Sequence, residues 1–232
     1  MKGYFITGTD TGVGKTLIGG AITRALVRSG RRVGVLKPFE TGCRLQGNRL
    51  VPEDAVFLKE MSGCQEDIST VCPYCLKHPL APWVAATIEN VEIEVERIKS
   101  IFLEMQRKYD VVLVEGAGGL MVPIDGNLLI LDLVKILDIP LIIVSRLSLG
   151  TINHTLLTVK QARSSGIEIA GIVLNQVFAV TGKAEETNPY VIRKFSGAPI
   201  LGQIPFISKE NRKDEAYLAN LASECIDLTP FS

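Results

Sequence analysis

The sequence predicts an α/β protein with a mostly parallel sheet and helices on both of its faces. Three observations predict this class. Short apolar runs alternate along the chain with longer stretches whose apolar residues recur at the spacing of an amphipathic helix. The run VVLV at 111–114 has no polar alternation, which is typical of a parallel strand covered on both faces. A glycine-rich segment at 8–16 lies between an apolar run and a helical pattern, as in a strand–loop–helix unit.

The individual elements follow from local patterns. The run GYFIT at 3–7 predicts a buried strand. In residues 16–29, Ile18, Ile22 and Leu26 share one face of a helix, and Gly30 follows as a stop signal. The expected strands are 3–7, 33–36, 111–114, 141–144, 169–174 and a short one at 199–202. The expected helices are 16–29, 53–61, 95–107, 128–137, 151–164, 186–195 and a last one that starts near Asn211. Residues 39–51, rich in Gly, Arg and Asn, are expected to form a functional loop.

The bulk composition fits one globular domain. A length of 232 residues suits a single α/β domain, and we expect residues 1–232 to form it. The formal net charge is zero, which favours neither nucleic acid nor an anionic membrane as a partner. No apolar run approaches the roughly 18 residues of a membrane span, and the apolar stretch near the N-terminus is too short for a signal peptide. We therefore expect a cytoplasmic protein that binds neither nucleic acid nor membrane.

The cysteines predict no metal site. The chain has five, an odd count that favours reduced thiols in a chain without a signal peptide. Cys72 and Cys75 form a CxxC pair, but a zinc site would need a second pair or several histidines, and only His78 is close. We expect ordinary thiols near a turn.

The segment Gly8-Thr-Asp-Thr-Gly-Val-Gly-Lys-Thr16 predicts a phosphate-binding loop. It departs from the strict pattern GxxxxGK[ST], because Thr9 stands where the first glycine should be. Gly12 and Gly14 let backbone N–H groups approach phosphate oxygens at a helix N-terminus. Lys15 can reach the β- and γ-phosphates, and the hydroxyl of Thr16 can bind Mg²⁺. These features predict a P-loop NTPase type of fold that binds a purine nucleoside triphosphate with Mg²⁺.

Charged residues follow two further strands and point to the same edge of the sheet. Glu115 ends the run VVLV, and Asp54 lies at an expected helix start, so both are candidate Mg²⁺ ligands. Asp54 has an equally simple role as an acid favoured by the helix dipole. Lys37 ends the second strand and faces the ligand crevice; the alternative is an exposed lysine at a strand end. Thr41 offers a hydroxyl to a small substrate.

Other candidates lie at the ends of later strands. Residues 116–119 can supply a second cluster of N–H donors. The amides of Asn175 and Gln176 suit the edge of a purine, although a polar turn is as good an explanation. Residues 150–153 open a helix and can bind an anion. His154 follows this start, and we assign it no chemistry.

These motifs resemble those of the dethiobiotin synthase family. The resemblance runs in order from GTDTGVGKT at 8–16 through KP at 37–38, TG at 41–42, EDA at 53–55, VEGAGGL at 114–120, LGTINHTLLT at 149–158, LNQ at 174–176 and GQIPF at 202–206. It spans nearly the whole chain and accounts for Thr9, because this family carries that variant of the loop. It implies a single P-loop ATP-dependent synthetase domain over residues 1–232.

The resemblance implies an ATP- and Mg²⁺-dependent enzyme of biotin biosynthesis that acts on 7,8-diaminopelargonate and CO₂. One amine takes up CO₂ as a carbamate. The carbamate attacks the γ-phosphate of ATP and gives a carbamic–phosphoric anhydride. The second amine then closes the ureido ring and releases phosphate.

The resemblance also implies residue roles. Lys37 and Lys15 would be catalytic, and the Mg²⁺ ligands would be Thr16, Asp54 and Glu115. The nucleotide would contact Gly12, Val13, Gly14, Lys15, Thr16, Leu17, Asp54, Glu115, Gly116, Ala117, Gly118, Asn175, Gln176, Ile204, Pro205 and Phe206. The substrate would contact Thr11 and Thr41, and Gly150 and Asn153 would serve the neighbouring site of a symmetric homodimer. Gly12 stands where some members carry Glu, so any contact from that side chain is absent.

The main alternative is a partitioning or positioning ATPase that acts as a switch on a membrane or DNA. Such proteins carry a lysine early in the loop, where this chain has Thr9-Asp10-Thr11, and they use basic tails or surfaces. The last 15 residues here, LANLASECIDLTPFS, are neutral to acidic. An amidoligase of cobalamin synthesis would need a further glutaminase domain, for which the chain has no room.

Overall fold

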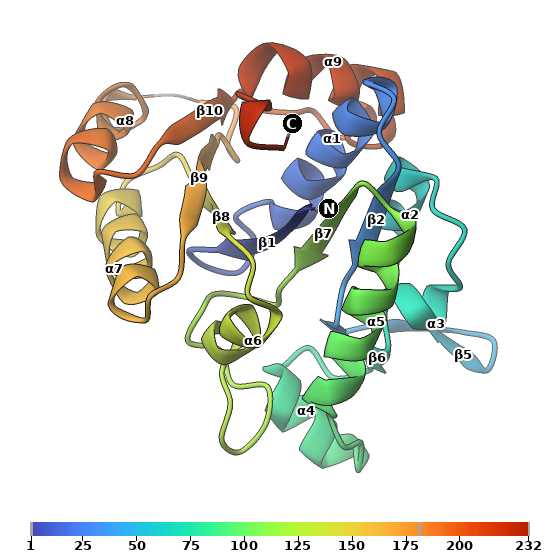
Figure 1. The fold of residues 1–232 in the computed structure, drawn as a ribbon. Helices are drawn as coiled ribbons and strands as arrows, with labels where there is room; N and C mark the ends of the chain where they lie inside the picture. Colours follow the sequence, from blue (N-terminus) through green and yellow to red (C-terminus); the bar gives the residue numbers. More distant parts are fainter. Residues whose placement is uncertain (1, 181, 232) are drawn as a thin grey trace.

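A six-stranded parallel sheet forms the centre of the protein. The structure is a computed structural model that describes residues 2–180 and 182–231. The strand order is β10-β9-β8-β1-β7-β2, with β1 in the interior of the sheet (Figure 1). The strands are β1 (Lys2–Gly8), β2 (Val33–Leu36), β7 (Val111–Glu115), β8 (Leu141–Arg146), β9 (Ile169–Asn175) and β10 (Ile200–Ile204). All of their pairings are parallel, so their carboxyl ends lie along one edge.

Helices cover both faces of this sheet. Side chains of β1 alternate between the two faces: Phe5 packs into one apolar cluster, and Tyr4 and Ile6 pack into the other. Helices α1 and α9 supply the second cluster, whereas α5 to α8 supply the first. The helices are α1 (Lys15–Arg28), α2 (Glu53–Ser62), α3 (Ile68–Val71), α4 (Pro82–Glu89), α5 (Val95–Lys108), α6 (Ile130–Leu137), α7 (Thr151–Ser164), α8 (Lys183–Ser196) and α9 (Glu215–Cys225).

The predicted fold class and all six predicted strands are confirmed. Each predicted helix is present, with shifted ends in several cases. The helix expected at 128–137 begins at Ile130, because the Asp132 carboxylate accepts the N–H of Leu129 and caps the helix there. The helix expected near Asn211 is a short 3₁₀ turn, and α9 begins after Asp214, whose side chain accepts the N–H of Tyr217.

The prediction that residues 39–51 form one loop is wrong. This segment holds β3 (Phe39–Thr41) and a hairpin of β4 (Arg44–Gln46) and β5 (Arg49–Val51). Strand β3 pairs in parallel with β6 (Tyr74–Leu76), which was also not predicted. Each of these strands has three residues, which is too short to show a period of two. Helices α3 and α4 were also not predicted, and α3 has only four residues.

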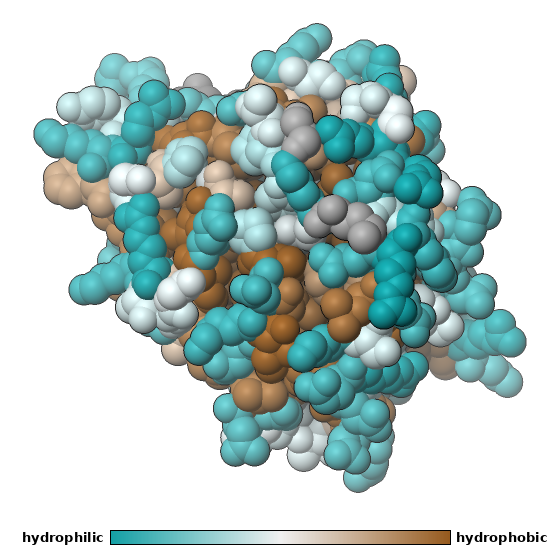
Figure 2. All heavy atoms as spheres, in the orientation of Figure 1, coloured by the Kyte–Doolittle hydropathy of each residue, from teal (hydrophilic) through white to brown (hydrophobic). Residues whose placement is uncertain are grey.

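Polar side chains surround an apolar area on one face of the molecule. Figure 2 shows hydrophilic side chains around the outline and apolar side chains gathered toward the middle of the face drawn. Large exposed apolar side chains include Leu149, Leu157 and Phe178. In the described part of the chain, no helix is both long and apolar enough to cross a membrane.

Candidate active site

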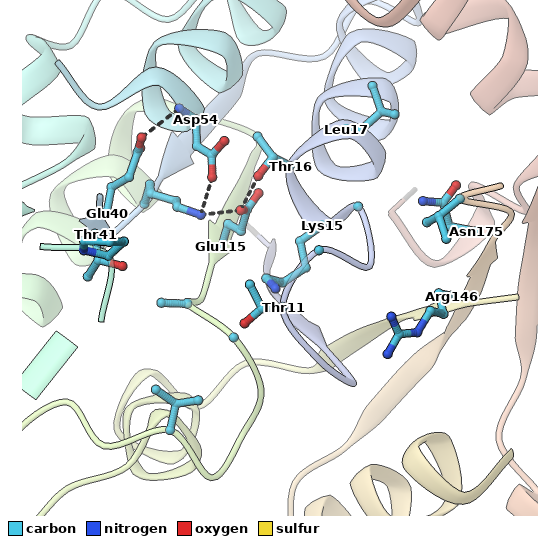
Figure 3. Close-up of a pocket in the computed structure, with 18 of the residues that line it drawn as sticks. Thr11, Lys15, Thr16, Leu17, Glu40, Thr41, Asp54, Glu115, Arg146 and Asn175 are labelled. Atoms are coloured by element: carbon cyan, nitrogen blue, oxygen red, sulfur yellow. Dashed lines mark hydrogen bonds and ion pairs between the residues drawn. The ribbon is translucent and has the colours of Figure 1, made fainter. Parts of the chain in front are cut away.

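A pocket of about 900 Å³ opens at the carboxyl edge of the sheet. It lies where parallel α/β sheets bind ligands. Most of the predicted site residues line it (Figure 3). They are Thr11, Gly12, Gly14, Lys15, Thr16, Leu17, Lys37, Thr41, Asp54, Glu115, Ala117, Gly118, Asn175 and Gln176.

The loop between β1 and α1 has the conformation of an anion cradle. Gly12 and Gly14 have φ angles of +74° and +93°, which L side chains rarely adopt. A Cβ atom on Gly14 would lie 2.2 Å from the Asn175 amide nitrogen, so a side chain has no room there. Helix α1 begins immediately after Gly14 and directs its free N–H groups toward the pocket. The loop is therefore built to bind phosphate oxygens.

Lys15 bends back over this loop. Its Nζ donates to the backbone carbonyl of Asp10 at 3.2 Å, and the residue is 8% exposed. Burial lowers the pKa of Lys15, with the Lys37 cation adding to the effect and the Glu115 carboxylate opposing it. A buried ammonium group at the centre of a phosphate loop is stabilised when an anion binds beside it.

Lys37, Asp54, Glu115 and Thr16 form a charged cluster opposite the loop. The Nζ of Lys37 contacts Glu115 Oε1 and lies 3.2 Å from Asp54 Oδ2. The hydroxyl of Thr16 donates to the same Glu115 oxygen at 2.7 Å. Burial by itself would lower the pKa of Lys37, but Glu115 and Asp54 outweigh burial and raise it. The two neighbouring carboxylates therefore favour the charged form of Lys37.

The oxygens of this cluster fit a magnesium ion. The second carboxylate oxygen of Glu115, Oε2, is buried and has no hydrogen-bond partner in the part of the chain that the structure describes. Such an atom is costly unless a cation or donor binds it. Asp54 and Thr16 bring a carboxylate and a hydroxyl to the same place. These three side chains are too few to hold a metal alone, and within the described ranges no group of three or more His, Cys, Asp or Glu could do so. Mg²⁺ beside a nucleotide takes most of its ligands from phosphate and water.

Glu40 is a site residue that the sequence analysis missed. Its two carboxylate oxygens accept the backbone N–H groups of Asp54 and Ala55, each at 2.9 Å. Glu40 thus caps the start of α2 and orients Asp54 toward Lys37. Burial raises the pKa of Glu40 to about 7, against the two N–H bonds. The sequence offered no local signal for this role, because the contact joins residues 14 positions apart.

The segment 79–82 forms one wall of the pocket and was not predicted either. Pro79, Leu80, Ala81 and Pro82 line the pocket beside Thr41. The Glu89 carboxylate anchors the segment just before them: it accepts the backbone N–H of His78 at 3.0 Å and contacts His78 Nδ1 at 2.8 Å. His78 is thereby an orienting residue for this wall of the pocket.

Asn175 lines the pocket but also supports the phosphate loop. Its side-chain amide donates to the carbonyl of Val13 at 2.9 Å, and the residue is 4% exposed. Gln176, the next residue, lines the outer end of the pocket with Phe178 and Arg212. The amide of Asn175 therefore holds the loop in addition to facing the ligand space.

Seven predicted site residues lie outside the pocket lining. Val13, Gly116 and Ile204 are buried, and Pro205 and Phe206 directly follow β10, just before Ile207, which does line the pocket. Gly150 and Asn153 lie at the start of α7, are exposed, and do not line the pocket of the same chain.

The geometry defines a class of protein. A phosphate loop between a strand and a helix, with Lys15, Thr16 and acids on neighbouring strands, is the arrangement of P-loop nucleoside triphosphate-binding proteins. A family model described as an AAA domain matches residues 2–213.

Curated relatives narrow the class to one family. The ATP-dependent dethiobiotin synthetase BioD of Thermodesulfovibrio yellowstonii is 41% identical over 220 residues, which are 90% of this chain and 91% of that protein. The protein of the same name from Bacillus subtilis strain 168 is 41% identical over 214 residues, 92% of this chain and 91% of that protein. The chain belongs to the ATP-dependent dethiobiotin synthetase family, and the resemblance seen in the motifs is confirmed.

Solved structures support the fold alone. The septum site-determining protein MinD of Pyrococcus horikoshii has a TM-score of 0.60 at 17% identity, over 96% of this chain and 95% of that one. A ParA family ATPase from Chlorobium tepidum has a TM-score of 0.56 at 19% identity, over 100% of this chain and 94% of that one. At these identities the likeness extends to the arrangement of strands and helices.

Proposed function

We propose that this protein carboxylates 7,8-diaminopelargonate with CO₂ and closes the product to dethiobiotin, with ATP as the phosphoryl donor. The observation that carries the proposal is the position of Lys37. This cation lies in the same pocket as the phosphate loop and Thr41, between the two acids that fit a magnesium ion. The family of the chain is the second support.

The reaction proceeds in three balanced steps. An amine of the substrate adds to CO₂ and loses a proton to give a carbamate. A carbamate oxygen displaces ADP from the γ-phosphorus and forms a carbamic–phosphoric anhydride. The second amine attacks the carbonyl carbon, loses a proton, closes the ureido ring and expels phosphate as the bond from carbon to the phosphate oxygen breaks.

The residues of the pocket supply positioning and charge. The N–H groups at the start of α1 and the ammonium of Lys15 bind the phosphates. Lys37 offsets the charge of the carbamate and of the phosphoryl group in transfer. Thr11 and Thr41 hold the amines from opposite sides of the pocket, and the wall at 79–82 excludes water from the anhydride.

Mg²⁺ is part of this proposal. Thr16, Asp54 and Glu115 would hold it, and the ion would neutralise charge on the β- and γ-phosphates. The nucleotide base would lie at the outer end of the pocket beside Asn175 and Gln176, with the backbone of 204–206 behind it.

Isotope transfer tests the proposal. The protein is incubated with ATP, Mg²⁺, the diamine and ¹³C-bicarbonate, and the products are measured by mass spectrometry. We expect dethiobiotin that carries the label in its ureido carbonyl, with one phosphate released per molecule. A matched monoamine, which lacks the second nucleophile, should yield no ring product. Recovery of unchanged diamine while ATP is consumed would contradict the proposal.

We further propose that residues 1–232 act as one synthetase domain in a symmetric homodimer in the cytoplasm, without nucleic acid or membrane as partners. Each site would bind the substrate's carboxylate at the partner's α7 start, through Gly150 and Asn153. In support, Leu149 directly before this start is 89% exposed and Leu157 on α7 is 58% exposed, as expected of a surface that another chain covers.

Subunit mixing tests the shared site. Asn153→Ala should weaken diamine binding and leave ATP binding intact. When this chain is mixed with a Lys37→Ala chain, activity should return, because one site of each heterodimer carries neither change. Demonstrated subunit exchange without recovered activity, or a monomer at working concentration, would overturn the shared site.

A further inference from the structure

Arg146 is a cation of the pocket that the proposed reaction leaves without a role. It ends β8 and lines the pocket on the same side as Asn175, opposite the Lys37 cluster (Figure 3). Its Nη2 donates to Asp10 Oδ2 at 2.8 Å, and its side chain is 30% exposed. Asp10 and Arg146 are 136 positions apart, so their contact joins the phosphate loop to a distant strand.

Two neighbouring strands hold the two halves of the loop. Arg146 of β8 and Asn175 of β9 are register partners in the sheet. Asn175 binds the carbonyl of Val13 in the second half of the loop, and Arg146 binds the side chain of Asp10 in the first half. Strand β8 also binds Thr9, whose N–H donates to the carbonyl of Val144 at 3.0 Å. The first half of the loop is therefore anchored to the end of β8.

The contact between Arg146 and Asp10 also has an electrostatic role. Its Oδ1 accepts the N–H of Thr11 at 2.7 Å, which fixes the turn of the loop, and its carbonyl accepts from Lys15. The carboxylate thus shapes the loop, but it places a negative charge beside the site for a triphosphate. An unpaired carboxylate there would repel the ligand. The Arg146 guanidinium offsets that charge.

We propose that Arg146 is a positioning residue for the nucleotide: by pairing with Asp10 it neutralises the carboxylate that the phosphate loop itself places beside the triphosphate. The inference rests on the proposed function only in that the pocket binds ATP. It predicts that Arg146 sets the affinity for ATP and has little effect on turnover once ATP is saturating.

A double-mutant cycle tests this role. ATP binding is measured by calorimetry for the wild type, Arg146→Gln, Asp10→Asn and the double variant. Arg146→Gln should raise the Kd of ATP by about tenfold or more, because it leaves the Asp10 carboxylate unpaired beside the phosphates. The double variant should return to within about threefold of the wild type, because the amide that replaces the Asp10 carboxylate carries no charge and its oxygen can still accept the Thr11 N–H.

Two further measurements separate this role from a structural one. The effect of Arg146→Gln should shrink as salt rises, and with activity as the readout it should appear in the KM for ATP and not in kcat. Arg32→Gln is the matched control, because it breaks an Arg–Asp pair of similar length at the opposite edge of the sheet and should leave ATP binding unchanged.

The outcomes are distinct. Unchanged ATP affinity in Arg146→Gln overturns the inference, and so does a double variant as weak as Arg146→Gln. If Arg146→Gln fails to fold, the ATP affinity of Asp10→Asn decides. An affinity equal to or tighter than that of the wild type supports the inference. A tenfold loss of ATP affinity contradicts it. Failure of the wild type itself to bind ATP would count against the proposed function.

Discussion

The two edges of the central sheet carry ion pairs of opposite character. At the carboxyl edge, Lys37 and Glu115 are in contact with side chains only 6% and 2% exposed. At the amino edge, Arg32 and Asp110 pair at 2.7 Å with side chains 69% and 36% exposed. Water solvates the second pair and screens it, so its contribution to stability is small. The first pair has lost that solvation, and a buried pair is a weak source of stability even when its geometry is good.

The difference indicates that groups unfavourable for the stability of the fold are gathered at the candidate active site. The carboxyl edge combines a buried pair, a lysine with a lowered pKa and a carboxylate oxygen without a partner among the described residues. The lowered pKa of Lys15 and the unpartnered oxygen of Glu115 indicate a cost to folding, which an anion and a cation bound beside them would reduce. The amino edge contains ordinary turns and surface charges. Substitutions at the carboxyl edge should therefore have large effects on function, and substitutions at the amino edge should have small effects on stability.

Replacement of Lys37 should have the largest effect. Lys37→Ala should lower turnover by about 10²-fold or more, because one electrostatic group is lost from a site that excludes water. Nucleotide should still bind, since the phosphate loop is on a different strand. Steady-state assays and ATP binding measured in parallel check both statements, with Arg32→Ala as the control. Near-normal turnover in a folded Lys37→Ala variant would remove Lys37 from the active site.

Replacement of either acid should raise the Mg²⁺ concentration that activity requires. Glu115→Gln and Asp54→Asn should each raise the Mg²⁺ concentration for half-maximal activity, by about tenfold or more, because each loses a hard anionic ligand. Glu115 should show the larger effect, since it is nearly fully buried and Asp54 is 48% exposed. Magnesium titrations at saturating ATP measure the change, with Asp110→Asn as the control. An unchanged titration would make the replaced residue purely structural.

The exposed pair should have the smallest effect, and one that depends on pH. The hydrogen bonds from Arg32 lower the pKa of Asp110 from 3.8 to about 2. A depressed carboxyl pKa stabilises the fold above the unfolded value and loses that contribution as pH falls through the folded value. The urea midpoints of wild type and Asp110→Asn should therefore differ slightly at neutral pH. They should converge as pH falls from 3.8 to about 2. A difference that grows over this range would contradict the assignment.

The contrast also shows what could be predicted from the sequence. The six strands of the sheet and the residues that end them were predictable, because buried runs and a glycine-rich loop are local patterns. Parallel pairing then places Lys15, Lys37 and Glu115 at one edge, and the structure brings them together as predicted. The fold and these residues of the candidate site are therefore predictable from local sequence patterns.

The supporting contacts were not predictable in the same way. Glu40 caps α2 across 14 positions, and Arg146 reaches Asp10 across 136. No local pattern relates such pairs, because the fold creates their proximity. Asn175 was predicted to face the nucleotide base, and its bond to Val13 emerged only when β9 was placed beside the loop. The role of Gly150 and Asn153 depends on a second chain and stays a prediction.

We propose that the acceptor of the γ-phosphoryl group is the substrate carbamate and not a water molecule. Phosphate release from ATP and Mg²⁺ tests it most directly, with diaminopelargonate and bicarbonate each omitted in turn. We expect phosphate release to stay at background when either compound is missing and to rise only when both are present. Rapid release with ATP and Mg²⁺ alone would contradict it and favour a nucleotide switch.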